Sequence, residues 1–338
     1  MTVYQHFLAL GEVLLRLSPR SGELLADRPR LAMHVGGSEA NVAAALAGLG
    51  HRAGVATAVP DNALGDAAVT ALAGAGLDVG AMRRAPGRMG VYWVETGASL
   101  RAGQVIYDRK GSSFAVADGA MWDWSALLTA TERLHLSGIT VALGSNTTQI
   151  ALDAARAARR AGVPISFDGN YRAQLWAERA SVDVEPLREL VRSADILFGD
   201  HRDIGLLLGR MFSGDSPDAR RSASEAAFNA FPRLRLVAST VRLTPHVGEH
   251  VLSARVDTPQ GGVETAPLII PGVIDRIGSG DAFAAGVLHA HRMGSTVGKI
   301  AESGQALAAL AHSMEGDASR ITSRHLAAFV DDSKDVKR

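Results

Sequence analysis

Residues 278–288 read Gly-Ser-Gly-Asp-Ala-Phe-Ala-Ala-Gly-Val-Leu and form the most informative stretch of the chain. The glycines let the backbone approach a ligand closely, and the apolar residues after them are typical of a helix. The start of such a helix offers unpaired N–H groups and the positive end of the helix dipole to an anion. Asp281 lies at this point, where its carboxylate could accept a proton from a hydroxyl that attacks a phosphoryl group. Taken alone, an Asp here is more often a helix cap.

Residues 36–50 contain a second glycine pair, again in front of a helix rich in small residues. Gly36 and Gly37 permit close approach to a polyhydroxylated ligand, and Asn41 offers both a donor and an acceptor to a hydroxyl. By itself, this stretch is better explained as a capped, closely packed helix.

Between and around these motifs, short apolar runs alternate with Ala- and Leu-rich stretches of helical spacing. Runs without clear alternation suit strands that are buried on both faces, as in a parallel sheet covered by helices. The pattern predicts a doubly wound, mostly parallel α/β sheet flanked by helices. The predicted strands span residues 7–10, 134–136, 163–167, 196–198 and 234–238, and the predicted helices span 41–49, 148–161, 184–193 and 282–293.

Residues 22–35 and 87–115 break this rhythm, because they carry strand-like sequence without a helix between the strands. Residues 89–96 and 104–109 flank a turn with glycine at both ends, so the segment is either a plain edge hairpin or part of a small accessory sheet. Val105, Tyr107 and Arg109 share one face of their strand, which favours the accessory sheet. We predict one domain over residues 1–330, with lid strands from about 11–35 and 87–115, and a charged, frayed tail at 331–338.

Composition excludes several classes of protein. The 338 residues include 35 Lys or Arg, 35 Asp or Glu and no Cys, which rules out disulfides, thiolate metal sites and a cysteine nucleophile. A formal net charge of zero argues against a nucleic-acid partner. No apolar run is long enough to span a membrane, and the N-terminus lacks the pattern of a signal peptide. The composition predicts a cytoplasmic protein with neither a nucleic-acid nor a membrane partner.

Together, the two glycine motifs resemble those of the PfkB (ribokinase-like) family of carbohydrate kinases. Gly36, Gly37, Asn41 and Ala43 match the N-terminal motif, and residues 275–283 with Gly286 match the C-terminal one. The resemblance implies a ribokinase-like α/β fold with a small β-sheet lid, and an ATP-dependent kinase that uses Mg²⁺; a monovalent cation is left open. The resemblance also implies that Asp281 is the catalytic base. It implies that the backbone of the turn forms the anion hole, with the residues Gly278, Ser279 and Gly280.

Residues 168–176 resemble the Asp-x-Asn-x-Arg-x-x-Leu-Trp pattern of 2-keto-3-deoxygluconate kinases. A sugar acid carries a carboxylate and a keto oxygen, which arginine binds well through paired N–H groups. Arg172 could instead form a structural ion pair with Asp168. The resemblance implies a substrate-binding set of Gly36, Gly37, Asn41, Tyr92, Tyr107, Arg109, Asn170, Arg172 and Asp281.

The nucleotide side departs from the family pattern. Residues 200–203, Asp-His-Arg-Asp, replace the usual Asn-x-x-Glu near the metal, so Asp200 and Asp203 are the predicted Mg²⁺ residues, acting through water. Residues 238–242 stand where relatives carry a Lys-x-Gly-x-x-Gly stretch. The family positions imply a cofactor-binding set of Asp200, Thr240, Arg242, Gly278, Gly280, Ala309 and His312, with Gly272 and Ala282 near the adenine.

The resulting prediction is transfer of the ATP γ-phosphoryl group to the 6-hydroxyl of 2-dehydro-3-deoxygluconate. One alternative is a kinase for a neutral sugar such as ribose or fructose, and another is a sugar or nucleotide sensor without catalysis. The sequence does not separate the gluco and galacto epimers. Because lid sheets offer apolar faces and open edges, we also predict a homodimer formed through the lid.

Overall fold

The computed structural model describes residues 6–98, 100–170 and 183–330. Its centre is a ten-stranded sheet. The strands are β1 (His6–Leu10), β4 (Ala53–Val59), β5 (Met82–Arg84), β8 (Thr131–Ser137), β9 (Ile165–Asp168), β10 (Ile196–Phe198), β11 (Leu236–His246), β12 (Glu249–Thr258), β13 (Gly261–Glu264) and β14 (Leu268–Pro271). Their order is β13-β12-β11-β10-β9-β8-β1-β4-β5, with β14 also paired to β12. All neighbours from β11 to β5 are parallel, whereas β12 pairs antiparallel with β11, β13 and β14.

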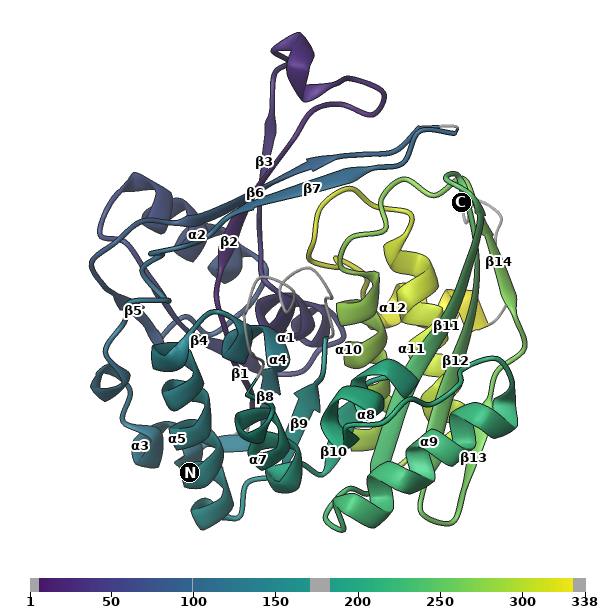
Figure 1. Cartoon of the computed structure of the whole chain (residues 1–338). Coiled ribbons are helices and arrows are strands. Elements are labelled where there is room, and N and C mark those ends of the chain that lie inside the picture. Colours follow the sequence, from purple (N-terminus) through teal and green to yellow (C-terminus); the bar gives the residue numbers. More distant parts are fainter. Residues whose placement is uncertain (1–5, 99, 171–182, 331–338) are drawn as a thin grey trace.

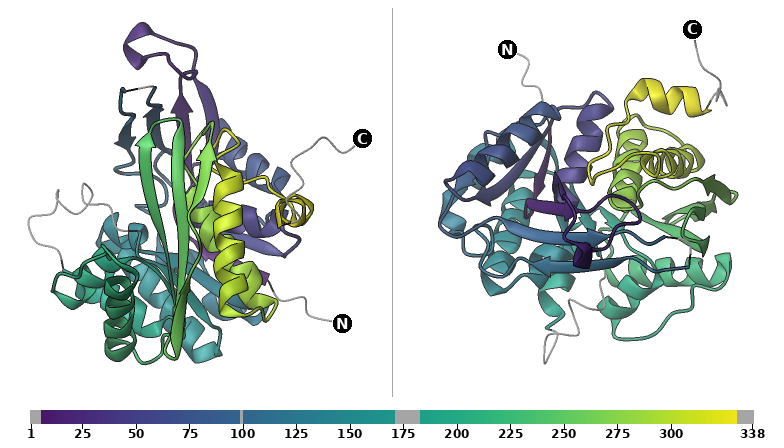
Figure 2. Two further views of the ribbon diagram at one scale, coloured as in Figure 1. Left: turned by 90° about the vertical axis from the view of Figure 1, so that its right-hand side faces the viewer. Right: turned by 90° about the horizontal axis from the view of Figure 1, so that it is seen from above.

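The sheet is covered on both faces, which explains the apolar runs without alternation. In β1, Phe7 and Ala9 pack into one hydrophobic core, while Leu8 and Leu10 pack into the other. Figure 2 (left) shows the sheet between two layers of helices. The first layer comprises α1 (Ser38–Gly48), α2 (Ala63–Gly74), α10 (Ser279–Arg292), α11 (Val297–Ala311) and α12 (Ser323–Val330). The second comprises α3 (Trp124–Thr129), α4 (Gly138–Ala142), α5 (Ser145–Ala161), α7 (Glu185–Ser193), α8 (His201–Leu208) and α9 (Pro217–Ala230). Two short 3₁₀ helices are η1 (Leu25–Asp27) and η2 (Gly119–Met121).

A separate four-stranded sheet projects above this core (Figure 1). It contains β2 (Leu14–Ser18), β3 (Ala32–Gly36), β6 (Gly90–Glu95) and β7 (Gln104–Asp108), in the order β3-β2-β6-β7. Arg16, Tyr92 and Tyr107 are aligned across three of these strands and therefore share one face of the sheet. We call this sheet the lid.

The predicted doubly wound sheet and a separate small sheet are confirmed. The main difference concerns β11, which continues to His246 instead of ending at residue 238, and forms a long antiparallel hairpin with β12. This hairpin rises beside the lid (Figure 1). Arg172 and the tail at 331–338 lie outside the described residues. Within the described ranges, no helix is both long enough and apolar enough to cross a membrane.

Candidate active site

The glycine-rich turn begins α10, as its sequence predicts. Gly278 precedes the first residue of the helix and has a φ of 78°, a left-handed conformation that favours glycine. A Cβ atom at this position would lie 1.9 Å from the backbone oxygen of Asp317, so close packing also requires glycine. The first amide of α10, that of Ser279, donates to Arg276 O at 3.3 Å, whereas the amides of Gly280 and Asp281 have no acceptor within the helix and can bind an anion.

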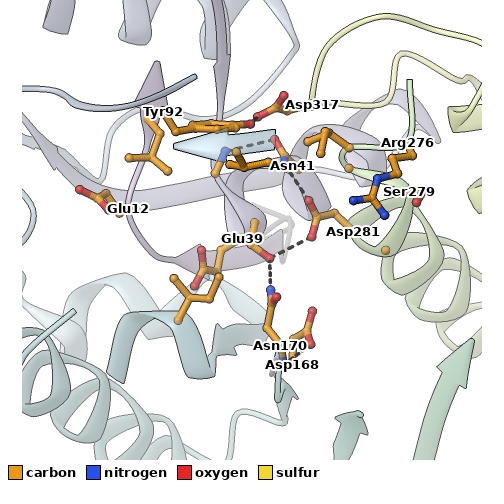
Figure 3. Close-up of a pocket in the computed structure, with 18 of the residues that line it drawn as sticks. Glu12, Glu39, Asn41, Tyr92, Asp168, Asn170, Arg276, Ser279, Asp281 and Asp317 are labelled. Carbon is orange, nitrogen blue, oxygen red and sulfur yellow. Dashed lines mark hydrogen bonds between the residues drawn. The ribbon is translucent and has the colours of Figure 1, made fainter. Parts of the chain in front are cut away.

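Asp281, in the first turn of α10, is held by the second glycine motif. Its Oδ1 accepts a hydrogen bond from Ser38 Oγ at 2.9 Å, and its Oδ2 accepts one from Asn41 Nδ2 at 2.7 Å. Asn170 Nδ2 donates in turn to Ser38 Oγ at 2.8 Å, which links β9 to the same network (Figure 3). Two motifs separated by about 240 positions therefore fix the direction of one carboxylate.

This carboxylate faces a cavity of about 560 Å³ between the lid and the core. Most of the predicted catalytic and substrate-binding residues line it: Gly37, Asn41, Tyr92, Tyr107, Arg109, Asn170, Gly278, Ser279, Gly280 and Asp281. Gly36 is buried outside the cavity lining, with the Asp317 side chain directly beside it. The structure thus brings the two motifs and the lid together around one site.

The lid contributes two tyrosines and an arginine to the cavity. Tyr92 and Tyr107 stack with ring centroids 5.6 Å apart, and the Tyr92 hydroxyl donates to Asp317. Burial and the neighbouring Asp317 carboxylate raise the pKa of Tyr92, so it remains a donor. Arg109 Nε donates to Glu12 Oε2 at 2.7 Å, and both side chains are buried. Glu12 therefore balances the charge of Arg109 at the cavity wall, a partner that sequence reasoning missed.

A second cavity of about 410 Å³ meets the first at the glycine turn. The two share Asp168, Asn170, Arg242, Ser279 and Gly280 as lining residues. Of the other predicted cofactor-binding residues, Asp200 and Thr240 line the second cavity, and Gly278 lines the first. Gly272, Ala282, Ala309 and His312 line neither cavity, whereas Ala308 lines the second.

Positive charge is concentrated where the cavities join. Arg242 and Arg276 line the first cavity and, within the described residues, neither guanidinium forms an ion pair with a carboxylate. Arg242 shares the first cavity with Arg276 and the second with Arg202, and burial followed by these two charges lowers the pKa of Arg242. An anionic phosphate chain would relieve this repulsion. Sequence reasoning had given Arg276 no role, although it lies directly before the turn.

Three carboxylates line the second cavity, those of Asp168, Asp200 and Asp203. Burial, followed by the charges of Asp281 and Asp203, raises the pKa of Asp168 well above its usual value. Asp203 Oδ2 accepts the backbone N–H of Asp200, while the Asp200 side chain caps α8 and binds Arg202. Although burial opposes ionisation, these bonds from Arg202 hold the pKa of Asp200 below its usual value. A divalent cation would offset the repulsion around Asp168.

The carboxylates suit a hydrated cation better than a bare one. Across the part of the chain that the structure describes, no three acidic or histidine side chains are arranged to hold a metal ion directly. Mg²⁺ commonly keeps several water ligands and binds mainly through one or two carboxylates and substrate phosphates. The residues present therefore fit a magnesium ion that is held through water.

A carboxylate beside a helix N-terminus, in a cavity that a lid covers, is an arrangement that suits phosphoryl transfer to a hydroxyl group. The model of the pfkB family carbohydrate kinases matches residues 5–324, and the chain belongs to this family. It is therefore a phosphotransferase with a carbohydrate kinase fold.

Individual relatives act on sugar acids. The chain is 31% identical to the 2-dehydro-3-deoxygalactonokinase of Haloferax volcanii over 92% of each chain. It is 31% identical to the solved 2-dehydro-3-deoxygluconokinase of Thermotoga maritima, with a TM-score of 0.91, covering 97% of this chain and 98% of that one. An E. coli structure in complex with ATP and Mg²⁺ has the same fold at 17% identity and a TM-score of 0.76, covering 97% and 99%. The first two of these relatives support a sugar-acid kinase.

Proposed function

We propose that the protein transfers the γ-phosphoryl group of ATP to the 6-hydroxyl of 2-dehydro-3-deoxygluconate. The position of Asp281 carries this proposal. Its carboxylate lies in the wall of the 560 Å³ cavity, one residue after Gly280, which lines both cavities. A sugar in the first cavity and a nucleotide in the second would meet beside this carboxylate.

In this proposal, Asp281 takes the proton of the attacking hydroxyl, while Ser38 and Asn41 keep its carboxylate oriented. The first amides of α10, with Arg242 and Arg276, balance the charge that spreads over the phosphoryl oxygens. ATP with Mg²⁺ supplies the phosphoryl group and a further positive charge. Asp200 and Asp203 would hold the ion through water.

Two observations favour a sugar acid over a neutral sugar. Two of the relatives reported above are named for 2-dehydro-3-deoxy sugar acids, and they represent both the gluco and the galacto epimer at equal identity. Arg109 lines the cavity from the lid side, with Glu12 fixing its guanidinium through Nε. A guanidinium in this fixed position can bind a carboxylate or a keto oxygen of the substrate.

ATP turnover on a panel of sugars tests the proposal. The panel contains 2-dehydro-3-deoxygluconate, its galacto epimer, ribose and fructose, and the readout is ADP formation coupled to a second enzyme. We expect turnover with the sugar acids and a kcat/KM at least about tenfold lower with the neutral sugars. A preference for ribose or fructose would contradict the proposed substrate. Binding of a sugar without any ADP formation would instead favour the sensor.

We further propose that two copies of the chain associate through their lids. On the lid face opposite to Arg16 and Tyr92, Leu17 is aligned with Met33 and Trp93, and Trp93 is aligned with Ile106. Met33 is 48% exposed and Ile106 is 43% exposed, so this face presents apolar side chains to solvent. A second copy of the same face would bury them.

Replacing Met33 and Ile106 together by aspartate is expected to convert a dimer to a monomer. Both side chains are already exposed in the single chain, so the fold should tolerate the change, whereas a carboxylate in an apolar interface is unfavourable. Light scattering after size-exclusion chromatography gives the mass. Met211→Asp serves as the control, since Met211 is 98% exposed in a loop remote from the lid. A monomeric mass for the unmodified protein would contradict the proposal.

A further inference from the structure

Arg16 is a buried cation that the site described above does not use. It lies on β2 of the lid, and its side chain is 1% exposed. Its Nη1 lies 2.6 Å from Asp275 Oδ2 and 3.0 Å from Asp317 Oδ1, and both carboxylates are also buried. Burial of such a charge is unfavourable unless it is closely paired, so the geometry of the three groups is strongly constrained.

The first of these carboxylates is tied to the glycine turn. Asp275 Oδ1 accepts the backbone N–H of Ile277 at 3.0 Å, and Ile277 immediately precedes Gly278. Asp275 Oδ2 accepts the backbone N–H of Gly316 at 3.2 Å, which fixes the neighbouring loop. A displacement of Asp275 would therefore move the residue from which the anion hole begins.

The second carboxylate contacts the lid and both glycine motifs. Asp317 accepts a hydrogen bond from the Tyr92 hydroxyl, and the two side chains lie together beside the cavity (Figure 3). Its backbone oxygen packs against Gly278, and a Cβ atom at Gly36 would lie 2.2 Å from its Oδ2. Arg16 thus joins, through two carboxylates, the lid sheet to the turn that receives the phosphoryl group.

We propose that Arg16 is a positioning residue for phosphoryl transfer, which sets the glycine turn at 278–280 relative to the lid. It does not line the substrate cavity and acts through Asp275 and Asp317. Without its guanidinium, two buried carboxylates would repel each other, and the turn would lose its fixed distance from the lid. Since small misplacements of reacting groups cost on the order of 100-fold in rate, the loss should appear in kcat.

The test compares Arg16→Met with Arg101→Met. Arg101 is also a lid arginine, but it forms a half-exposed ion pair with Glu95 at 2.9 Å and lines neither cavity. We expect Arg16→Met to lower kcat about 100-fold, with the KM for sugar changed by less than about threefold. In Arg16→Ala, which unlike Arg16→Met leaves space for the added group, methylguanidinium in the buffer should raise kcat about tenfold. Arg101→Met should resemble the unmodified protein in both assays.

A folded Arg16→Met variant with nearly unchanged kcat would overturn the proposal. So would a loss of activity that follows only the fraction of unfolded protein and does not respond to methylguanidinium. If Arg16→Met does not fold, Arg16→Lys decides, because an ammonium keeps the charge but ends a shorter side chain and cannot take the position of Nη1 between the two carboxylates. We then expect a kcat about tenfold lower than normal, and an unchanged kcat would contradict the proposal.

This inference rests on the proposed function only for the choice of substrate. The unmodified protein is the baseline for every variant. Failure of that baseline on the whole sugar panel would contradict the proposed function. An active baseline together with fully active Arg16→Met or Arg16→Lys would contradict only the role of Arg16.

Discussion

Asp281→Asn is expected to lower kcat by about 10²–10⁴-fold, the usual effect of losing a general base. The amide has nearly the same shape as the carboxylate: its oxygen can still accept from Asn41 Nδ2, and its NH2 group can donate to Ser38 Oγ, so the fold and the substrate KM should change little. It cannot, however, take a proton from the attacking hydroxyl. Steady-state kinetics with ATP and the best sugar of the panel measure the effect, and circular dichroism checks the fold.

Asp118→Asn provides the matched control for this substitution. Asp118 is an exposed aspartate that caps η2 through the Ala120 N–H, a task that asparagine performs equally well. It should retain normal kcat. Nearly full kcat in a folded Asp281→Asn protein would show that another group removes the proton.

Gly278→Ala is expected to cause the largest loss of stability among single glycine substitutions in the turn. A left-handed φ of 78° costs a non-glycine residue about 1–2 kcal/mol. The new Cβ would also lie 1.9 Å from the Asp317 backbone oxygen, so either the turn or the loop must move. We expect a lower Tm together with a loss of kinase activity, measured by thermal unfolding and by ADP formation.

Substitutions at two other glycines distinguish the backbone cost of Gly278→Ala from its steric clash with Asp317. Gly294 also has a left-handed φ, of 69°, but a Cβ there would meet no atom within 4 Å, so Gly294→Ala measures the backbone cost alone. Gly280 has neither a positive φ nor a neighbour within 4 Å, and Gly280→Ala should leave Tm unchanged. Equal Tm values for Gly278→Ala and Gly294→Ala would contradict the close packing of the turn against Asp317.

Local pattern was sufficient to predict the fold, and the resemblance of two motifs selected most of the residues that line the first cavity. The apolar runs predict buried strands because a strand that is covered on both faces needs apolar side chains at successive positions. In β1, successive side chains pack alternately into the two hydrophobic cores. The assignment of Asn41 and Asp281 to one substrate-binding set followed from the resemblance of two motifs to one family. Neither the prediction of the fold nor that of the substrate-binding set required knowledge of side-chain contacts.

The long-range charge pairs could not be predicted in this way. Arg16 and Asp317 are 301 positions apart, and nothing in the sequence near either residue indicates the other. Glu12 pairs with Arg109 across 97 positions, and on sequence alone Arg109 had been assigned wholly to the substrate. The extension of β11 was missed because residues 239–246 are largely polar or exposed, so periodicity does not distinguish them from a loop.

Product analysis by ³¹P and ¹H nuclear magnetic resonance tests the central claim most directly. The unmodified protein is incubated with ATP, Mg²⁺ and 2-dehydro-3-deoxygluconate, and the new phosphorus signal is correlated with the sugar protons. We expect one phosphomonoester whose phosphorus couples to the two methylene protons at C6, and almost none with Asp281→Asn in the same time. A phosphoryl group on another carbon, or ATP hydrolysis without a sugar phosphate, would contradict the account.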